Sequence, residues 1–172
     1  MKRVKKKNQG IFNAIELASY IKYKYSLLNN KISNEISPLK LQKSLYFCFA
    51  YWGGFIRKGK DGNQKSEFEH AYSEYLFDNV IEAWVYGPVI PDVYHKQDII
   101  KPNKKEEMFI GKEYIKEFID DILNDVLHVS DFKLVEASHQ DKCWKNNFKK
   151  SEIFHNNEIP KEEIIREYAN QI

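Results

Sequence analysis

The sequence predicts a mainly α-helical single domain with one small antiparallel β-hairpin. Three observations lead to this prediction. In several segments apolar residues recur every three or four positions, which is the period of an amphipathic helix. Serine, aspartate or proline stands where most of these segments begin, and such residues favour helix N-termini. Only residues 68–87 favour strands. With 172 residues and 42% hydrophobic content, the chain can form one core.

The N-terminal part divides into a tail and a helix. Residues 1–10 are predicted to be a flexible basic tail, because five of positions 2 to 7 are lysine or arginine. A helical stripe then runs from Ile11 to Leu28, and Asn29-Asn30 is expected to end it. Residues 11–172 are expected to form the single domain.

A second helix has a clear predicted start and end. Ser37 suits the N-cap and Pro38 the first helical position. Gly53-Gly54 is expected to stop the helix, as glycine commonly does at a C-terminus. Nearly every position from 45 to 52 is apolar or aromatic, so this helix is expected to be central and buried on several sides.

The middle of the chain is predicted to contain the hairpin. Residues 57–67 have the composition of a solvated loop. Residues 68–87 favour two strands around a turn at Asp78-Asn79, although a helix over the first half of this segment is an alternative. Pro91 and Asp92 suit the first turn of a short helix that runs toward Lys101-Pro102.

Further helices are predicted after residue 110. The strongest apolar stripe of the chain spans residues 115–126. Ser130-Asp131 is expected to open another helix, Asp141 a short one that carries Trp144 and Phe148, and Pro160 the last one.

Motifs for common enzyme chemistry are missing from the sequence. The seven glycines form no phosphate-binding loop, and neither Ser nor Cys occurs in a nucleophile-elbow context. His139 and Cys143 have a spacing that places both on one helix face, but two ligands are too few for a metal site. We therefore expect a protein that is not an enzyme and has no cofactor or metal.

The charge and the apolar pattern constrain location and partners. The net charge is only +2, so binding of a polyanion needs local clustering of lysines. The basic tail could contact nucleic acid phosphates weakly, or act only as a solubilising tail. No signal-peptide core or membrane-spanning run is present, which predicts a cytoplasmic protein that does not use a membrane.

The segment IEAWVYGPVIPDVYHK, residues 81–96, carries the most specific pattern. Trp84 and Tyr86 are two positions apart, so in a strand they share a face. Gly87 permits an unusual φ or a close backbone approach, and Pro88 fixes the following φ. Such a corner is either packed into the core or exposed for recognition. Tyr94 and Tyr86 carry hydroxyl groups that need a polar partner or water.

Four segments occur in an order that resembles the Panacea domain, the SocA-like antitoxin domain also found in phage-associated proteins. They are PLKLQKSLYFCFAYW (38–52), IEAWVYGPVIPDVYHK (81–96), LVEASHQDKCWKNNF (134–148) and IPKEEIIREYA (159–169). The resemblance covers about residues 14 to 170. The motif positions, which the resemblance implies are scaffold, are Leu41, Gln42, Lys43, Glu82, Trp84, Gly87, Pro88, Pro91, His139 and Trp144.

The resemblance implies a cytosolic antitoxin that neutralises a protein toxin by direct binding. The toxin is expected from a neighbouring gene, and many toxins paired with this family block translation. Candidate partner-binding residues are Tyr86, Tyr94 and His95. The alternative function is a phage- or mobile-element-encoded regulatory protein that binds a host protein or nucleic acid and has no cognate toxin. We expect His139 to be hydrogen-bonded near the interior, with Trp144 packed close by.

The sequence departs from the usual pattern of the family at a few places. The family usually has leucine at the position of Ser44, a Thr-His pair where this chain has Ser138-His139, and proline at the position of Cys143. The segment 57–74 is also longer than usual. Together with the basic tail, this segment is a candidate for partner specificity.

Overall fold

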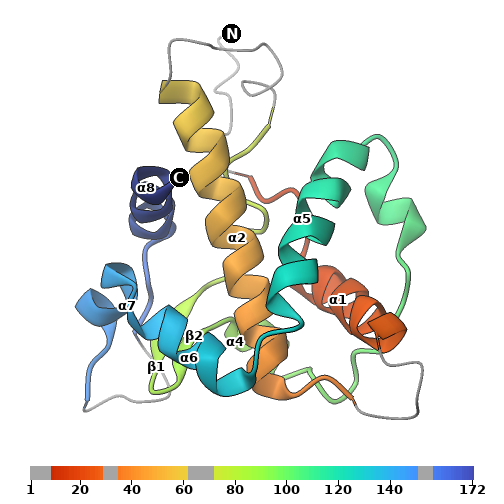
Figure 1. Ribbon diagram of the computed structural model, residues 1–172, viewed down its shortest axis with the longest axis horizontal. Coiled ribbons are helices and arrows are strands. Elements are labelled where there is room, and N and C mark those ends of the chain that lie inside the picture. The colour runs from red at the N-terminus through yellow and green to blue at the C-terminus, as the bar shows by residue number, and fades with distance from the viewer. Residues whose placement is uncertain (1–8, 29–34, 62–71, 151–156) are drawn as a thin grey trace, which may run out of the picture.

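The protein is built around one long central helix, α2 (Pro38–Asp61). Helices α1 (Ala14–Leu28), α5 (Glu113–Val126) and α8 (Lys161–Gln171) pack against it, α8 on one side and α1 and α5 on the other (Figure 1). The computed structural model describes residues 9–28, 35–61, 72–150 and 157–172.

The remaining elements are short, and several of them pack against α2. The two strands β1 and β2 form an antiparallel hairpin in which Trp84 pairs with Gly87. The predicted fold class, mainly α-helical with a small hairpin, is therefore confirmed. The short elements are β1 (Glu82–Trp84), β2 (Gly87–Val89), α4 (Pro91–Tyr94), the 3-10 helix η1 (Glu106–Phe109), α6 (Asp131–His139) and α7 (Lys142–Asn147).

Helix α1 begins three residues later than the apolar stripe indicates. The backbone N–H groups of Ile11 and Phe12 donate to the carbonyls of Tyr75 and Leu76, so these residues extend beside another segment instead of coiling. Asn13 then caps the helix, because its side-chain oxygen accepts from the N–H of Ile15 at 2.8 Å. Ile11 thus packs as an apolar residue that precedes the helix and is not part of its apolar face.

The hairpin is not at Asp78-Asn79, and that prediction is wrong. Both side chains bind the N-terminal segment instead: Asp78 accepts from the N–H of Gly10, and Asn79 accepts from the N–H of Ala14 at 3.0 Å. Asp and Asn favour tight turns, but their short side chains also accept hydrogen bonds, and here both side chains accept from the N-terminal segment. The turn of the hairpin lies instead at Val85-Tyr86.

Helix α2 does not stop at Gly53-Gly54 but continues to Asp61, so part of the predicted loop 57–67 is helical. The two glycines lie where α8 crosses α2. A Cβ on Gly54 would come within 2.7 Å of the Cβ of Tyr168, and one on Gly53 within 2.6 Å of Ile165. Glycine is therefore present for close helix packing rather than for helix termination.

Helix α4 is shorter than expected and ends at Tyr94. The chain continues to Ile99 in turns, because the N–H groups of Lys96 and Ile99 each bond to the carbonyl three residues earlier. Pro91 occupies the first helical turn as predicted.

Helices α5, α6, α7 and α8 all form close to their predicted positions. Ser130 caps α6 as predicted, by accepting from the N–H of Lys133. Asp141 precedes α7 but makes no side-chain cap hydrogen bond. Its role is taken by Glu167 of α8, whose two carboxylate oxygens accept from the N–H groups of Lys142 and Cys143 at 2.7 and 2.8 Å.

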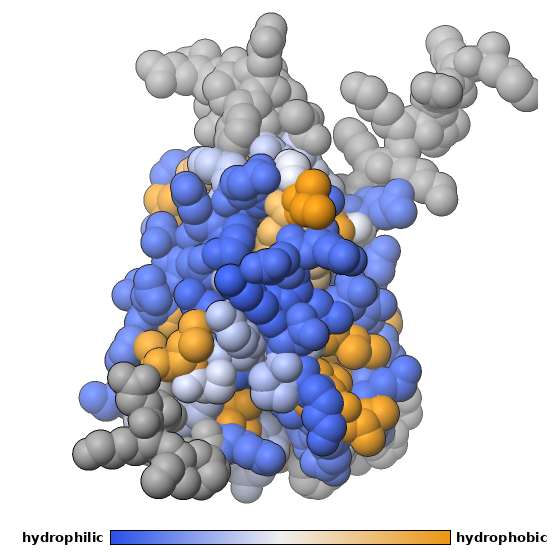
Figure 2. All heavy atoms as spheres, turned by 90° about the vertical axis from the view of Figure 1, so that its right-hand side faces the viewer, coloured by the Kyte–Doolittle hydropathy of each residue, from blue (hydrophilic) through white to orange (hydrophobic). Residues whose placement is uncertain are grey.

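The outer face over α1 and α5 is mainly hydrophilic, with separate hydrophobic spots (Figure 2). Among the described helices, none has the length and apolar character that crossing a lipid bilayer requires.

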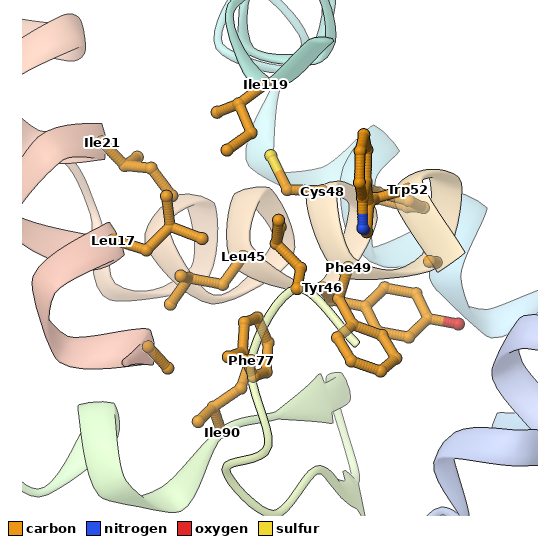
Figure 3. Packing of buried hydrophobic residues seen from close by; sticks show 14 of the residues in the cluster. Leu17, Ile21, Leu45, Tyr46, Cys48, Phe49, Trp52, Phe77, Ile90 and Ile119 are labelled. Carbon is orange, nitrogen blue, oxygen red and sulfur yellow. The ribbon is translucent and has the colours of Figure 1, made fainter. Parts of the chain in front are cut away.

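The core surrounds α2, as its apolar sequence indicates. Its side chains contact α1, α5, the segment before β1 and the residue after β2 (Figure 3). Residues that meet there are Leu17, Ile21, Leu45, Tyr46, Cys48, Phe49, Trp52, Phe77, Ile90 and Ile119, all at most 1% exposed. One end of this core is covered by the hairpin, which is where the family motif residues gather.

Candidate functional site

The hairpin turn accepts only glycine at position 87. Gly87 has a φ of 107°, which lies in the region that L side chains rarely adopt. An added Cβ would also lie 2.4 Å from Oγ of Ser138 and 2.8 Å from Cε of Lys43. Both the backbone conformation and the close approach of α6 and α2 therefore require glycine.

Two side chains of α2 hold the second half of the hairpin. Gln42 bonds to Ile90 in both directions: its Oε1 accepts from the backbone N–H at 2.8 Å, and its Nε2 donates to the carbonyl at 3.3 Å. Lys43 Nζ donates to the carbonyl of Pro88 at 3.0 Å. Neighbouring residues of one helix thus fix the chain on both sides of Val89.

Two side chains from α6 and α7 hold the first half. Nε1 of Trp144 donates to the carbonyl of Trp84 at 2.8 Å. Nε2 of His139 lies 3.0 Å from the carbonyl of Val85, and because a carbonyl only accepts, the imidazole carries its proton on Nε2. The His139 and Trp144 rings stack with centroids 4.1 Å apart, which agrees with the expected positions of both residues.

We call Gln42, Lys43, His139 and Trp144 the hairpin clamp. They come from three helices, and each satisfies backbone groups of residues 84–90 that burial removes from water. A clamp of this kind fixes the hairpin rigidly on the helical body. The scaffold role implied for these four positions is consistent with these contacts.

Burial shapes the electrostatics of the clamp. Lys43 is fully buried, and desolvation lowers its pKa to about 7. Within the described residues, no carboxylate lies at ion-pair distance from its ammonium group. Burial and the nearby Lys43 also lower the pKa of His139, with the hydrogen bond to Val85 opposing them. Burial thus favours the uncharged forms of both Lys43 and His139.

The remaining motif residues are buried or half-buried. Leu41 is 1% exposed, and Trp84 is 8% exposed with its Nε1 donating to a carboxylate oxygen of Glu82 at 3.2 Å. Pro88 and Pro91 flank the exit from β2 into α4.

The outward surface of the hairpin carries exposed aromatic side chains. Tyr86, in the turn, is 57% exposed, and Tyr94 is 42% exposed. The Tyr94 ring packs edge-on against Trp84, with centroids 4.9 Å apart, and His95 lies 5.5 Å from Tyr94. We call Tyr86, Tyr94 and His95 the hairpin surface.

Trp84 and Tyr86 do not share a face, contrary to the sequence prediction. β1 ends at Trp84, and the two-residue turn interrupts the alternation of side chains. The structure therefore buries Trp84 and exposes Tyr86. It brings Tyr94 and His95 together, while the described ring contacts do not join Tyr86 to this pair.

Sequence reasoning missed Asn157 as part of the site. Its backbone carbonyl accepts from the N–H of Ala83 at 2.7 Å, and its Nδ2 donates to the Ala83 carbonyl at 3.2 Å. The segment around it thereby adds to the open edge of β1. Nothing in the local sequence signals this contact, because the partners lie 74 residues apart.

His139 and Cys143 do not converge on a common point. His139 bonds to the hairpin, whereas Cys143 Sγ lies 3.4 Å from the hydroxyl of Tyr46 in the core. Burial raises the pKa of the Cys143 thiol. Among the described residues, no three His, Cys, Asp or Glu side chains are grouped as metal ligands.

A comparison of the sequence with models of known protein families gave a match. A family model described as the SocA-like antitoxin, Panacea domain, matches residues 41–145, more than half of the chain. The chain therefore belongs to the SocA-like antitoxin family with a Panacea domain. The match contains the whole hairpin clamp, while all of α1 and all of α8, most of which the wider resemblance includes, lie outside it. Searches among curated proteins and among solved structures gave no match.

Proposed function

We propose that this protein is a cytosolic antitoxin that neutralises a protein toxin, encoded by a neighbouring gene, by direct binding. Membership in the SocA-like antitoxin family supports a protein partner of this kind. The observation that carries the proposal is the hairpin surface: Tyr86 directly follows the clamped residues Trp84 and Val85, and the Tyr94 ring packs against Trp84. Rigid, exposed aromatic residues are typical anchors of protein interfaces, since little entropy is lost when they bind.

The proposed action is binding and not catalysis. Two titratable groups that contact the hairpin, those of Lys43 and His139, both bond to backbone carbonyls. Tyr86 and Tyr94, in contrast, present ring and hydroxyl groups to a partner.

A rescue experiment tests this proposal. Cells that express the neighbouring toxin should survive when the intact chain is co-expressed, and should die with the Tyr86→Ala/Tyr94→Ala variant. The variant should remain folded and melt within a few degrees of the wild type, because Tyr86 is exposed and Tyr94 loses only its contact with Trp84. A matched control, Phe132→Ala/Ile110→Ala, removes two apolar side chains that are 71% and 72% exposed elsewhere, and should still protect.

The opposite pattern would refute the placement of the interface. If the control variant fails to protect while the tyrosine variant still does, the partner binds another face. If the intact chain never protects but shifts nucleic acid at physiological salt, it is a regulatory protein instead.

A further inference from the structure

The segment 142–150, which forms α7 and the residues after it, carries a concentrated positive charge. Its sequence, KCWKNNFKK, contains lysine four times and no acidic residue. All four side chains are exposed. We call them the lysine surface: Lys142, Lys145, Lys149 and Lys150.

The acidic residues near α7 are turned toward its inner side. Glu167 accepts from two N–H groups at the start of α7, and Glu163 accepts from Nδ2 of Asn147 at 2.8 Å. Asp141 is buried and accepts from the hydroxyl groups of two buried tyrosines. Among the described residues, none of the four lysines takes part in an ion pair. Within the part of the chain that the structure describes, the outer side of α7 therefore carries positive charge that no ion pair neutralises.

An aromatic stack joins α7, which carries two of these lysines, to the backbone of the hairpin. Trp144 stacks on His139 and on Phe148, with centroids 4.1 and 4.9 Å apart and interplanar angles of 25° and 15°. The hydrogen bonds from His139 and Trp144 join this stack to the backbone of Trp84 and Val85, directly before Tyr86 in the turn. Figure 1 shows α7 and the hairpin on the same side of α2.

The stack also indicates which kind of anionic partner fits. Two nearly parallel rings, those of His139 and Phe148, already stack against Trp144. Single-stranded nucleic acids bind proteins by stacking bases on open aromatic faces between cationic side chains. These ring contacts reduce the aromatic surface that is open to a base, whereas a protein partner needs only complementary charge and exposed anchors such as Tyr86.

We infer that the lysine surface receives an acidic patch of the protein toxin while the hairpin surface contacts the same partner beside it. This inference rests on the proposed function and adds the charge of the partner to it. Charges at the rim of an interface act mainly on the rate of association and are screened by salt.

The association rate of the purified toxin with the full chain tests the inference. At low salt the Lys145→Glu/Lys149→Glu variant should associate at least about tenfold more slowly than the wild type, and in 0.5 M salt the difference should shrink to about twofold. Lys145→Gln/Lys149→Gln removes half as much charge and should give an intermediate rate. The control Lys58→Glu/Lys133→Glu changes net charge equally on exposed helical positions elsewhere and should associate within about twofold of the wild type. Thermal melts of each variant confirm folding.

Failure of the inference and failure of the proposed function give different results. If the wild type binds the toxin and the two lysine variants associate as fast as the control, the lysine surface is not the site of an acidic patch. The same conclusion follows if these variants lose only the binding of a single-stranded oligonucleotide. If the wild type does not bind the toxin, the proposed function is wrong and the inference falls with it.

Discussion

Lys43 makes the stability of the hairpin clamp depend on pH. Its pKa is about 7 in the folded protein, below its ordinary value of 10.5, because burial disfavours the charged form. Between pH 7 and 9 the unfolded chain keeps this proton while the folded chain releases it. The unfolded state then binds more protons, so the contribution of Lys43 to stability rises with pH, by about 2 kcal/mol over this range.

Comparison with Lys43→Met isolates this effect. Denaturant melts at pH 7, 8 and 9 give the unfolding free energy of each protein, and the wild type should gain about 2 kcal/mol relative to the variant as pH rises. Titrating groups that Lys43 does not influence contribute equally to both proteins, including the buried thiols, whose pKa values burial raises. A difference that stays constant with pH would show that Lys43 keeps its charge in the folded protein.

At this scale the sequence predicts local contacts well and distant ones poorly. Ser37 and Ser130 are recognisable as caps because the groups that they bind lie three residues away. The roles of Lys43 and His139 are different, since their acceptors lie 45 and 54 residues away. The family resemblance marks these positions, but only the structure shows that they hold the hairpin.

At the scale of elements, Gly54 tests how α2 and α8 pack. Helix propensity alone predicts that Gly54→Ala stabilises the protein by about 1 kcal/mol. The Cβ would meet the Cβ and the carbonyl carbon of Tyr168 at 2.7 and 2.8 Å, so α8 must shift. We therefore expect a net loss of about 1–3 kcal/mol of unfolding free energy, the range for overpacked sites, measured by denaturant melts. An equally or more stable variant would contradict the close packing of these helices.

Glu167 tests the capping of α7 by a distant side chain. Glu167→Ala removes both acceptors of the Lys142 and Cys143 N–H groups and should cost about 1–2 kcal/mol of stability, as loss of an N-cap does. Hydrogen exchange of these two amides should become faster. Glu167→Gln keeps one carbonyl acceptor and should fall between the wild type and Glu167→Ala. If the exchange of these amides is unchanged in both variants, Glu167 of α8 does not cap α7.

The errors at this scale share one physical cause. Gly53-Gly54 and Asp78-Asn79 have the residue types of a helix stop and a turn, yet the first pair packs on α8 and the second binds the N-terminal segment. Local propensity is a weak guide where tertiary contacts use the same small or polar side chains for another purpose. The long amphipathic helix α5 lacks this ambiguity, and its position is predicted well.

At the scale of the molecule, the sequence indicates the fold class and, through the resemblance, the family. It does not show that the motif region has two parts: the hairpin clamp packs within the protein, whereas Tyr86 and Tyr94 are exposed at its surface. Residues 1–8 of the basic tail and residues 62–71 of the long segment, both candidates for partner specificity, lie outside the described residues. The central claim therefore concerns the described surface alone: the clamped hairpin presents the side chains that bind the partner.

A hydrogen-exchange footprint of the complex with the neighbouring toxin tests that claim most directly. Binding should slow the exchange of backbone amides at residues 85–86 and 94–96, because the partner excludes water from the hairpin surface. Residues 113–126 of α5 should exchange as in the free protein. Slower exchange over α5 with no change at the hairpin would contradict the account.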